Sequence, residues 1–401
     1  MDDLDCMNRT EKSVLKITRL KIGALYIPLF TWALFLSMLG QLVPFLRSEF
    51  GFSMAQTGLF MTMQSIGSMI SILFCMLFLD TFNKIKSLGL AILLFGLFVA
   101  AIGYSAFIFI TLSVFVLIGL SSGMNNTLSN AVISDLLPDK KSSYLNLTHA
   151  FFGLGGILGS MGASLFASMF GGRGAFIVFG VISVVFALYY IYVFRQEMRL
   201  PLMPKHLPVN QRISDLVAVI RRKGMKEVIV ASILFAYFQV NILFWGPSFY
   251  IEESDDPLTG ALALTLFFAG TALSRFIGSK FANKYKPHIF IFLFGILTAA
   301  AVIASILFSN LAVSLLFFGI IGFAAGNILP QLFAQSCAIA PDKSSVASGL
   351  VLMGYTLMAF VAPPMMGFIG DTWGLRYGFI LMAATILLAG LVSRSFKKIS
   401  V

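Results

Sequence analysis

Charged residues are scarce in this chain, and carboxylates are missing from the middle of every long apolar stretch. Of the 401 residues, 11% are charged and 58% are hydrophobic, and the mean hydropathy is +0.93. Soluble domains carry about 25% charged residues, so this composition excludes a soluble globular protein. Regular alternation of polar and apolar residues is also missing, which excludes an outer-membrane barrel.

The chain also has few of the residues that enzymes and metal sites need. It contains three histidines and three cysteines, with no pair at metal-ligand spacing. No Gly-Lys-Ser/Thr loop could cradle a phosphate, and no Ser/His/Asp set falls at one membrane depth. We therefore expect no enzymatic activity, no metal and no cofactor. The thiols of Cys6, Cys75 and Cys337 are expected to stay reduced and inert.

Apolar stretches of roughly 20 residues recur along the whole chain, each long enough to cross the roughly 30 Å hydrocarbon layer as a helix. We predict an all-α integral membrane protein with twelve transmembrane helices. The segment before the first helix contains Asp2, Asp3 and Glu11 and no apolar core, so we expect no removable signal peptide. The helices are predicted to be centred near Trp32, Ser68, Leu97, Gly119, Gly156, Val184, Gln239, Phe267, Ile296, Ile320, Met353 and Ala384.

The formal net charge of +11 is distributed unevenly over the predicted loops. One side of the membrane holds most of the Lys and Arg residues, whereas the other holds Arg47, Arg173, Arg376 and the acidic turn 252–256. Cytoplasmic loops carry such an excess of positive charge, so both termini of this multi-pass cell-membrane protein are predicted in the cytoplasm. The basic charge then reflects topology and contact with anionic lipid, and we expect no nucleic-acid partner.

One long unit occurs twice in the sequence. Gly119-Leu-Ser-Ser-Gly123 and Pro138-Asp-Lys140 reappear 203 positions later as Gly322-Phe-Ala-Ala-Gly326 and Pro341-Asp-Lys343. Such duplication is typical of transporters, and it predicts two pseudo-symmetric halves of six helices each. A long polar stretch with three prolines and a basic cluster separates them. We predict an N-terminal half at 1–194, a cytoplasmic linker at 195–226 and a C-terminal half at 227–401.

The loop after the second predicted helix, Met76-Leu-Phe-Leu-Asp80-Thr-Phe-Asn-Lys84, keeps one acidic and one basic residue. Arg275-Phe-Ile-Gly278 stands at the corresponding place in the second half. Together with the repeat and the charge asymmetry, these residues resemble the major facilitator superfamily over essentially the whole chain. The resemblance implies alternating access between the two halves, with gating contacts at Asp80, Lys84 and Arg275.

The fourth and fifth predicted helices carry a further resemblance. Asn130, Leu145-Asn-Leu147, His149 and the glycine run 153–159 are similar to the fucose:proton symporter group and related bacterial sugar permeases. Asn126 stands where those proteins tend to carry an acidic residue. That difference and the lack of mid-span carboxylates predict facilitated diffusion, or weak proton dependence through His149. The alternative role of His149 is a neutral side chain bonded to a neighbouring helix.

Several predicted helices carry polar side chains four positions apart, which places these side chains on one helix face. In the superfamily resembled here, helices 1, 4, 7 and 10 line the central cavity. Amides beside aromatic rings suit a neutral polyhydroxyl solute, because amides donate and accept hydrogen bonds and rings cover apolar sugar surface. The alternative is hydrogen bonding between helices. We expect the substrate site to contain Gln41, Asn126, Asn130, His149, Tyr237, Asn241, Trp245, Asn327 and Gln331.

We therefore predict a monomeric secondary transporter that moves a small polar, sugar-like solute across the lipid bilayer by alternating access. One alternative is efflux of amphipathic drugs or lipid-like molecules, because 42 Phe and 19 Met could form an adaptable apolar cavity. The other is a membrane sensor or structural subunit that does not transport. The sequence leaves open the identity of the solute, the direction of transport and the coupling ion.

Overall fold

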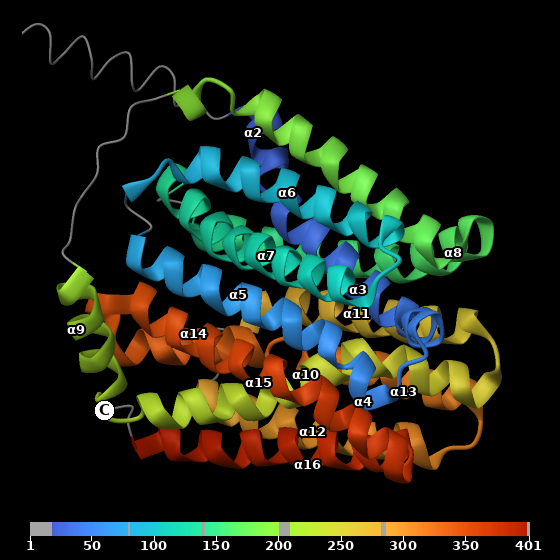
Figure 1. The fold of residues 1–401 in the computed structure, drawn as a ribbon. Helices are drawn as coiled ribbons and strands as arrows, with labels where there is room; N and C mark the ends of the chain where they lie inside the picture. The colour runs from blue at the N-terminus through green and yellow to red at the C-terminus, as the bar shows by residue number, and fades with distance from the viewer. Residues whose placement is uncertain (1–17, 79–80, 138–140, 200–208, 282–285, 399–401) are drawn as a thin grey trace, which may run out of the picture.

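The computed structural model describes residues 18–78, 81–137, 141–199, 209–281 and 286–398. Within these ranges, long helices run side by side along one axis and no strand is present (Figure 1). The first part of the chain forms α2 (Arg19–Ala24), α3 (Ile27–Phe50), α4 (Met54–Thr57), α5 (Leu59–Phe78), α6 (Lys84–Tyr104), α7 (Ile108–Leu136), α8 (Lys141–Val193), η3 (Glu197–Arg199) and α9 (Val209–Ile220). The rest forms α10 (Met225–Ser254), α11 (Pro257–Phe281), α12 (Pro287–Leu307), α13 (Leu311–Ala325), α14 (Ile328–Ile339), η4 (Pro341–Lys343), α15 (Ser344–Trp373), α16 (Leu375–Ser393) and η5 (Arg394–Lys398).

The described helices supply the predicted transmembrane segments. Eleven of them are long and apolar enough to cross a membrane, and one, Leu147–Val193, is 47 residues long. This segment consists of two transmembrane helices, because the chain reverses at Gly171 within α8, where φ is 72° and ψ is 169°. A positive φ is readily adopted only by glycine, which explains the residue at this turn. The predicted fold class, an all-α membrane protein with twelve crossings, is therefore confirmed.

Helix boundaries follow from local capping groups. The hydroxyl oxygen of Ser53 accepts from the backbone N–H of Gln56, whose side chain in turn accepts from the backbone N–H of Ser53, so a complete capping box opens α4. Asn83 accepts from the N–H of Lys86 at 2.9 Å and opens α6. Gly51 closes α3 with φ 62°. These caps fix the tight turns between antiparallel neighbours.

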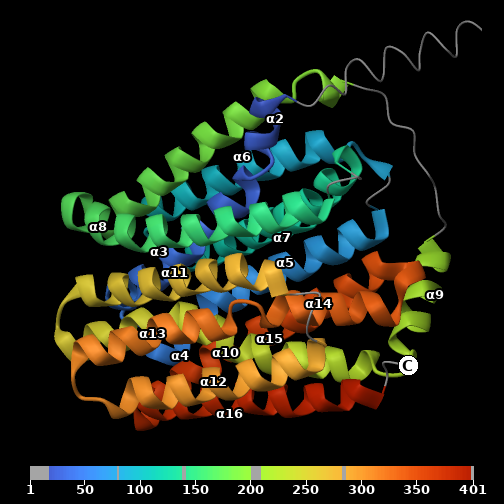
Figure 2. The ribbon, with the colours of Figure 1, turned by 180° about the vertical axis from the view of Figure 1, so that it is seen from behind.

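The bundle divides into an N-terminal half, α2–α8, and a C-terminal half, α10–α16, which lie against each other (Figures 1 and 2). Extensive packing across this boundary joins α8 to α11, α5 to α15 and α3 to α10. We call the end of the bundle that carries α9 and the C-terminus the linker end, and the opposite end the distal end. The segment predicted as linker, 195–226, contains η3 and α9.

The residues of the sequence repeat make equivalent helix–helix contacts in the two halves. In the N-terminal half, the Ser68 hydroxyl on α5 donates to the carbonyl oxygen of Gly119 on α7 at 3.1 Å. In the C-terminal half, the Thr271 hydroxyl on α11 donates to the carbonyl oxygen of Gly322 on α13, also at 3.1 Å. Both pairs are separated by the 203 positions that separate the sequence motifs. Each glycine lets two helix backbones touch, so the duplicated motif is a close helix-packing site.

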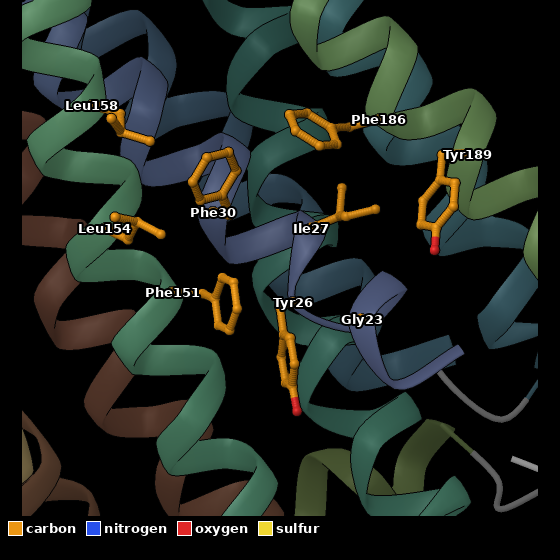
Figure 3. Close-up of a pocket in the computed structure, with 9 residues that line it drawn as sticks. All are labelled: Gly23, Tyr26, Ile27, Phe30, Phe151, Leu154, Leu158, Phe186 and Tyr189. Carbon is orange, nitrogen blue, oxygen red and sulfur yellow. The ribbon is translucent and has the colours of Figure 1, made fainter. Parts of the chain in front are cut away.

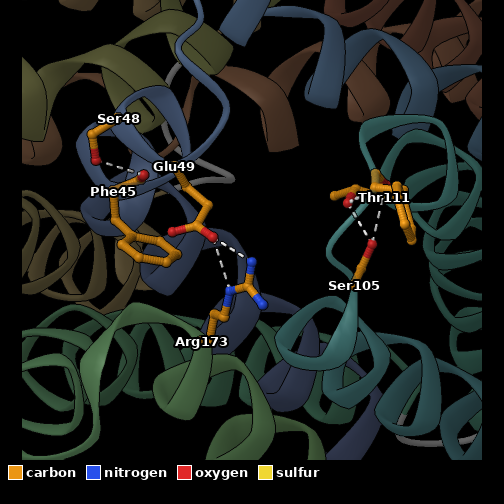
Figure 4. Close-up of polar contacts among 7 residues, drawn as sticks. Phe45, Ser48, Glu49, Ser105, Thr111 and Arg173 are labelled. Atoms are coloured by element: carbon orange, nitrogen blue, oxygen red, sulfur yellow. Dashed lines mark hydrogen bonds and ion pairs between the residues drawn. The ribbon is translucent and has the colours of Figure 1, made fainter.

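Both ends of the bundle carry ion pairs. At the distal end, Arg173 on the second arm of α8 pairs with Glu49 on α3 (Figure 4). The Ser48 hydroxyl donates to the Phe45 carbonyl oxygen, and the hydroxyls of Ser105 and Thr111 hydrogen-bond to each other. At the linker end, Lys84 Nζ lies 2.8 Å from a carboxylate oxygen of Asp135, which joins α6 to α7. These charges mark the two ends of the apolar bundle.

Candidate functional site

One face of α10 carries buried polar groups that have no partner in the protein. Tyr237, Asn241 and Ser248 are four and seven positions apart and are buried. The Tyr237 hydroxyl, both side-chain amide atoms of Asn241 and the Ser248 hydroxyl make no hydrogen bond within the described residues. Buried polar groups almost always have a partner, because leaving one unpaired is unfavourable. We call these three residues the α10 polar face; its buried donors and acceptors are available to water or to a polar solute.

Trp245 on the same helix already has a structural partner. Its indole Nε1 donates to the carbonyl oxygen of Pro363 on α15 at 3.0 Å, and its ring is fully buried. Two successive prolines at 363 and 364 remove backbone donors from α15. Pro364 has no N–H to donate to the carbonyl oxygen of Phe360, four residues before it. That carbonyl oxygen instead accepts from the Thr62 hydroxyl at 2.7 Å. The predicted site residue Trp245 therefore ties α10 to α15.

Gln41 spans the boundary between the halves. Its Nε2 donates to the carbonyl oxygen of Pro257 at the start of α11, at 2.6 Å. Its Oε1 is buried without a partner among the described residues. Gln41 thus contacts the other half through Nε2 at the distal end, and its Oε1 can still accept a hydrogen bond.

The predicted stripe on α7 changes exposure along its length. Asn126 is half-buried and Asn130 is exposed, and the Nδ2 of Asn130 donates to the carbonyl oxygen of Asn126 at 3.1 Å. Asn125 is fully buried, and neither of its amide atoms has a partner in the described chain. Four positions further along α7, the Ser129 hydroxyl is also buried and has no partner among the described residues. The sequence interpretation missed this second stripe, which the spacing of Ser121, Asn125 and Ser129 could have revealed.

The third group of predicted residues lies where α13 gives way to α14. Asn327 Nδ2 donates to the backbone oxygen of Ser274 at 2.6 Å and to its hydroxyl at 2.9 Å, so this amide joins α14 to α11. Gln331 and Gln335 follow at intervals of four and are buried. The predicted helix-10 stripe therefore exists, with its first member engaged in a structural contact.

Arg275 joins the two halves near the Asn327 contact. Its Nε donates to the carbonyl oxygen of Gly326 at 3.2 Å and its Nη1 to that of His149 at 3.1 Å. The guanidinium carbon lies 5.6 Å from the Phe152 ring centroid. Within the described ranges, no carboxylate pairs with this cation. A charge in a membrane span that faces no counter-ion is a candidate for solute binding as well as for gating.

Of the other residues predicted to gate transport, Lys84 lies at the linker end. Asp80 falls outside the described residues, so its predicted contact with Lys84 stays a prediction. Lys84 itself pairs with Asp135 within the N-terminal half. The linker helix α9 contacts both halves: Lys343 pairs with Asp215 at 2.7 Å, and Arg212 Nη1 donates to the carbonyl oxygen of Met76 at 3.3 Å.

A bidentate pair fixes the chain just after α9. Arg222 donates to both carboxylate oxygens of Asp342, at 2.6 and 2.7 Å. The hydrogen bonds from Arg222 lower the pKa of the Asp342 carboxyl below its ordinary value. Because Asp342 belongs to the second copy of the Pro-Asp-Lys motif, this copy anchors the start of α10.

At the distal end, an unpredicted contact holds the halves together. The two carboxylate oxygens of Asp371 on α15 accept from the backbone N–H groups of Met54 and Ala55, each at 2.9 Å. These are the first two residues of α4, where unpaired donors and the helix dipole favour a negative charge. Arg47 Nη1 lies 3.2 Å from Glu252 at the same boundary. We call these two contacts the distal gate.

Comparisons with known proteins identify the family. A family model of the Major Facilitator Superfamily matches residues 25–256 and 253–399. The chain is similar to a hexuronate transporter of Bacillus subtilis strain 168, with 23% identity over 373 residues and coverage of 86% of each chain.

Two solved structures share the fold at low identity. A bacterial homologue of the human lysosomal transporter Spinster, solved in an inward-facing and unoccupied conformation, has 14% identity and a TM-score of 0.78, covering 95% of this chain and 98% of that one. The Escherichia coli fucose:proton symporter has 16% identity and a TM-score of 0.67, covering 93% and 97%. The predicted resemblance is confirmed: the chain belongs to the Major Facilitator Superfamily and is a membrane transporter.

Proposed function

We propose that this transporter moves a small hydroxylated solute along a path between its two halves by alternating access. The α10 polar face supports this proposal most directly. Tyr237 and Asn241 together offer hydrogen-bond donors and acceptors that the protein leaves unused. A hydroxylated solute supplies both kinds of group. Each unpaired buried group that it satisfies removes a penalty of about 1 to 3 kcal/mol.

The proposed solute carries a negative charge in addition to its hydroxyl groups. Arg275 has no carboxylate partner among the described residues, and it lies six residues, or roughly 9 Å, from the linker end of α11. A carboxylate is the natural partner of a guanidinium. A sugar acid therefore fits the site better than a neutral sugar. The similarity to a hexuronate transporter supports this class, although it extends to only 23% identity.

The contacts across the halves support a state that is closed at the distal end. The distal gate and the Gln41 contact all cross the boundary there. In contrast, the polar stripe of α7 becomes more exposed toward the linker end, from buried Ser122 through Asn126 to exposed Asn130. With the basic linker end in the cytoplasm, this is an inward-facing state. Both termini then lie in the cytoplasm, as the charge distribution predicts.

Transport requires the distal gate to open while the linker end closes. The solute can drive this exchange only through a difference in its affinity for the two states. A solute can contact the α10 polar face and polar groups of the N-terminal half at the same time only when the two halves close around it. Its affinity therefore differs between the two states. In the spanning segments we expect no carboxylate relay, so facilitated diffusion or weak proton dependence through His149 remains the proposed coupling.

Flux in proteoliposomes tests this proposal. Purified protein is reconstituted and offered a radiolabelled hexuronate, the matching hexose and a hydrophobic cation. We expect the hexuronate to give the largest flux. Arg275→Gln, which keeps donors for Gly326 and His149 but loses the charge, should remove the advantage of the hexuronate over the hexose. Preferred flux of the hydrophobic cation would support amphipathic efflux instead, and no flux of any kind would support the sensor alternative.

A further inference from the structure

A cavity of about 310 Å³ lies in the N-terminal half, where all of its lining residues are found (Figure 3). It is lined by the junction of α2 and α3 and by both arms of α8. Leu154 and Leu158 on the first arm are 44% and 49% exposed, and Tyr189 on the second arm is 38% exposed. Because exposed apolar side chains of a membrane bundle face lipid, this cavity opens to the bilayer. We call it the α2–α8 groove.

The groove lies beside α8 at the place where the first transmembrane segment passes from α2 into α3. Helix α2 ends at Ala24 and α3 begins at Ile27. Gly23 faces open space, since a Cβ at this position would have no atom within 4 Å. Two aromatic contacts close the sides: Tyr26 stacks on Phe151 with 4.6 Å between centroids, and Phe30 meets Phe186 edge to face at 5.5 Å. The result is an apolar slot that extends two helical turns, roughly 10 Å, along the bundle.

The linker end of the groove is basic. Arg19 is exposed and lies four positions before Gly23, so it occupies the same face of α2 one turn nearer the linker end. On the second arm of α8, Tyr192 follows Tyr189 by one turn, and the Arg195 guanidinium lies 4.7 Å from the Tyr192 ring centroid. The Tyr189 hydroxyl donates to the carbonyl oxygen of Leu20 at 3.5 Å and links the two sides of the mouth.

We propose that the α2–α8 groove binds one acyl chain of an anionic phospholipid from the leaflet at the linker end, with its phosphate between Arg19 and Arg195. The apolar slot matches the chain, and the two guanidinium groups match the phosphate, which accepts charge-assisted hydrogen bonds. A transported solute is a poor fit, because the groove opens to lipid and does not meet the α10 polar face. This site is independent of the proposed solute path.

Binding of lipid at this place should stabilise the N-terminal half. The groove leaves apolar side chains of α3 and α8 without protein neighbours, and an acyl chain supplies the missing contacts. The first arm of α8 also packs extensively against α11 across the boundary. The lipid therefore sits behind a helix that moves when the halves change position.

Native mass spectrometry of the full-length protein tests the proposal. The protein is purified in mild detergent and equilibrated with phosphatidylglycerol or phosphatidylcholine of identical chains. We expect one phosphatidylglycerol to be retained roughly tenfold more strongly than phosphatidylcholine. Gly23→Leu fills the slot and should abolish this retention. The double variant Arg19→Gln, Arg195→Gln should lose the headgroup preference and bind both lipids equally. Leu165→Phe, at an exposed α8 position outside the groove, is the matched control.

Three results would overturn the proposal: equal retention of both lipids by the wild-type protein, unchanged retention by Gly23→Leu, or loss of solute binding rather than lipid binding in Gly23→Leu. The last result would assign the groove to the solute. Thermal unfolding of each variant shows whether it is folded, and Gly23→Leu is expected to fold because leucine favours the helix and a Cβ at this position has no atom within 4 Å. Failure of the hexuronate flux experiment leaves these outcomes unaffected.

Discussion

The carboxylate of Asp371 lies against the backbone N–H of Met54 at 2.9 Å and forms a second bond of equal length to the next residue. This contact joins α15 of one half to the first turn of α4 of the other. Two close backbone approaches surround it: Gly367 packs on the Met54 carbonyl, and Gly58 packs on the backbone at Pro363 and Pro364. The distal end is therefore held by a carboxylate at a helix N-terminus and by glycines that allow the helices to touch.

Asp371→Asn should shift the protein toward a state open at the distal end. An amide keeps the shape but loses the charge, and it offers one acceptor where the carboxylate offers two. The loss of about 1 to 3 kcal/mol predicts roughly a fivefold to hundredfold increase in the open population. Spin labels on the distal ends of α3 and α15 report the distance between the halves. Glu253→Gln, which disturbs a pair with Arg376 inside one half, is the control. An unchanged distance distribution in Asp371→Asn would contradict this role of Asp371 in the distal gate.

Asn241→Ala should weaken solute binding by roughly fivefold to more than a hundredfold, because it removes about 1 to 3 kcal/mol of hydrogen bonding from the α10 polar face. Membrane expression should stay at the wild-type level, since no partner among the described residues loses a bond. Isothermal titration with the solute of largest flux measures the effect. Thr298→Val on α12 removes a hydroxyl that donates to the Phe294 carbonyl oxygen of its own helix, and it should leave affinity unchanged. Wild-type affinity in Asn241→Ala would remove the α10 polar face from the path.

Asn125→Leu should raise the melting temperature and lower transport. The substitution replaces a buried amide that lacks partners with an apolar side chain, which is favourable when no bond is lost. Natural proteins keep such unfavourable groups where function requires them. The sequence alone ranks Asn126 above Asn125, and Asn126→Ala serves as the comparison. A lower melting temperature in Asn125→Leu would show that the amide has a structural partner, and unchanged flux would place Asn125 outside the path.

The Arg222–Asp342 pair should stabilise the folded state at neutral pH and lose its effect in acid. Because the pKa of Asp342 is lower in the folded protein than in the unfolded chain, its contribution is present above the unfolded value, about 4. The contribution disappears as the pH falls through the lower folded value. The difference in melting temperature between wild type and Asp342→Asn should therefore shrink between pH 7 and pH 3. A difference that is constant, or that grows in acid, contradicts this role of the pair.

Much of the fold could be predicted from the sequence, because span length, charge asymmetry and the repeat are properties of single segments. The equivalence of the Ser68 and Thr271 contacts shows that the duplicated motif already encodes one helix-packing site per half. The rotation of each helix was harder to predict. Asn125 and Asn126 differ by about 100° around α7, and the packed structure buries Asn125 rather than Asn126. The partner of Asp371 lies 317 residues away, so no local pattern indicates it.

Locking the distal gate tests alternating access most directly. In a background without native cysteines, Arg47→Cys and Glu252→Cys place two thiols across the boundary where the native side chains are 3.2 Å apart. A short bifunctional reagent with a reducible bond joins them, and flux of the best solute is measured before and after reduction. The account predicts that flux falls to the level of empty liposomes while solute still binds from the linker end, and that reduction restores flux. Continued flux through the cross-linked protein would contradict the account.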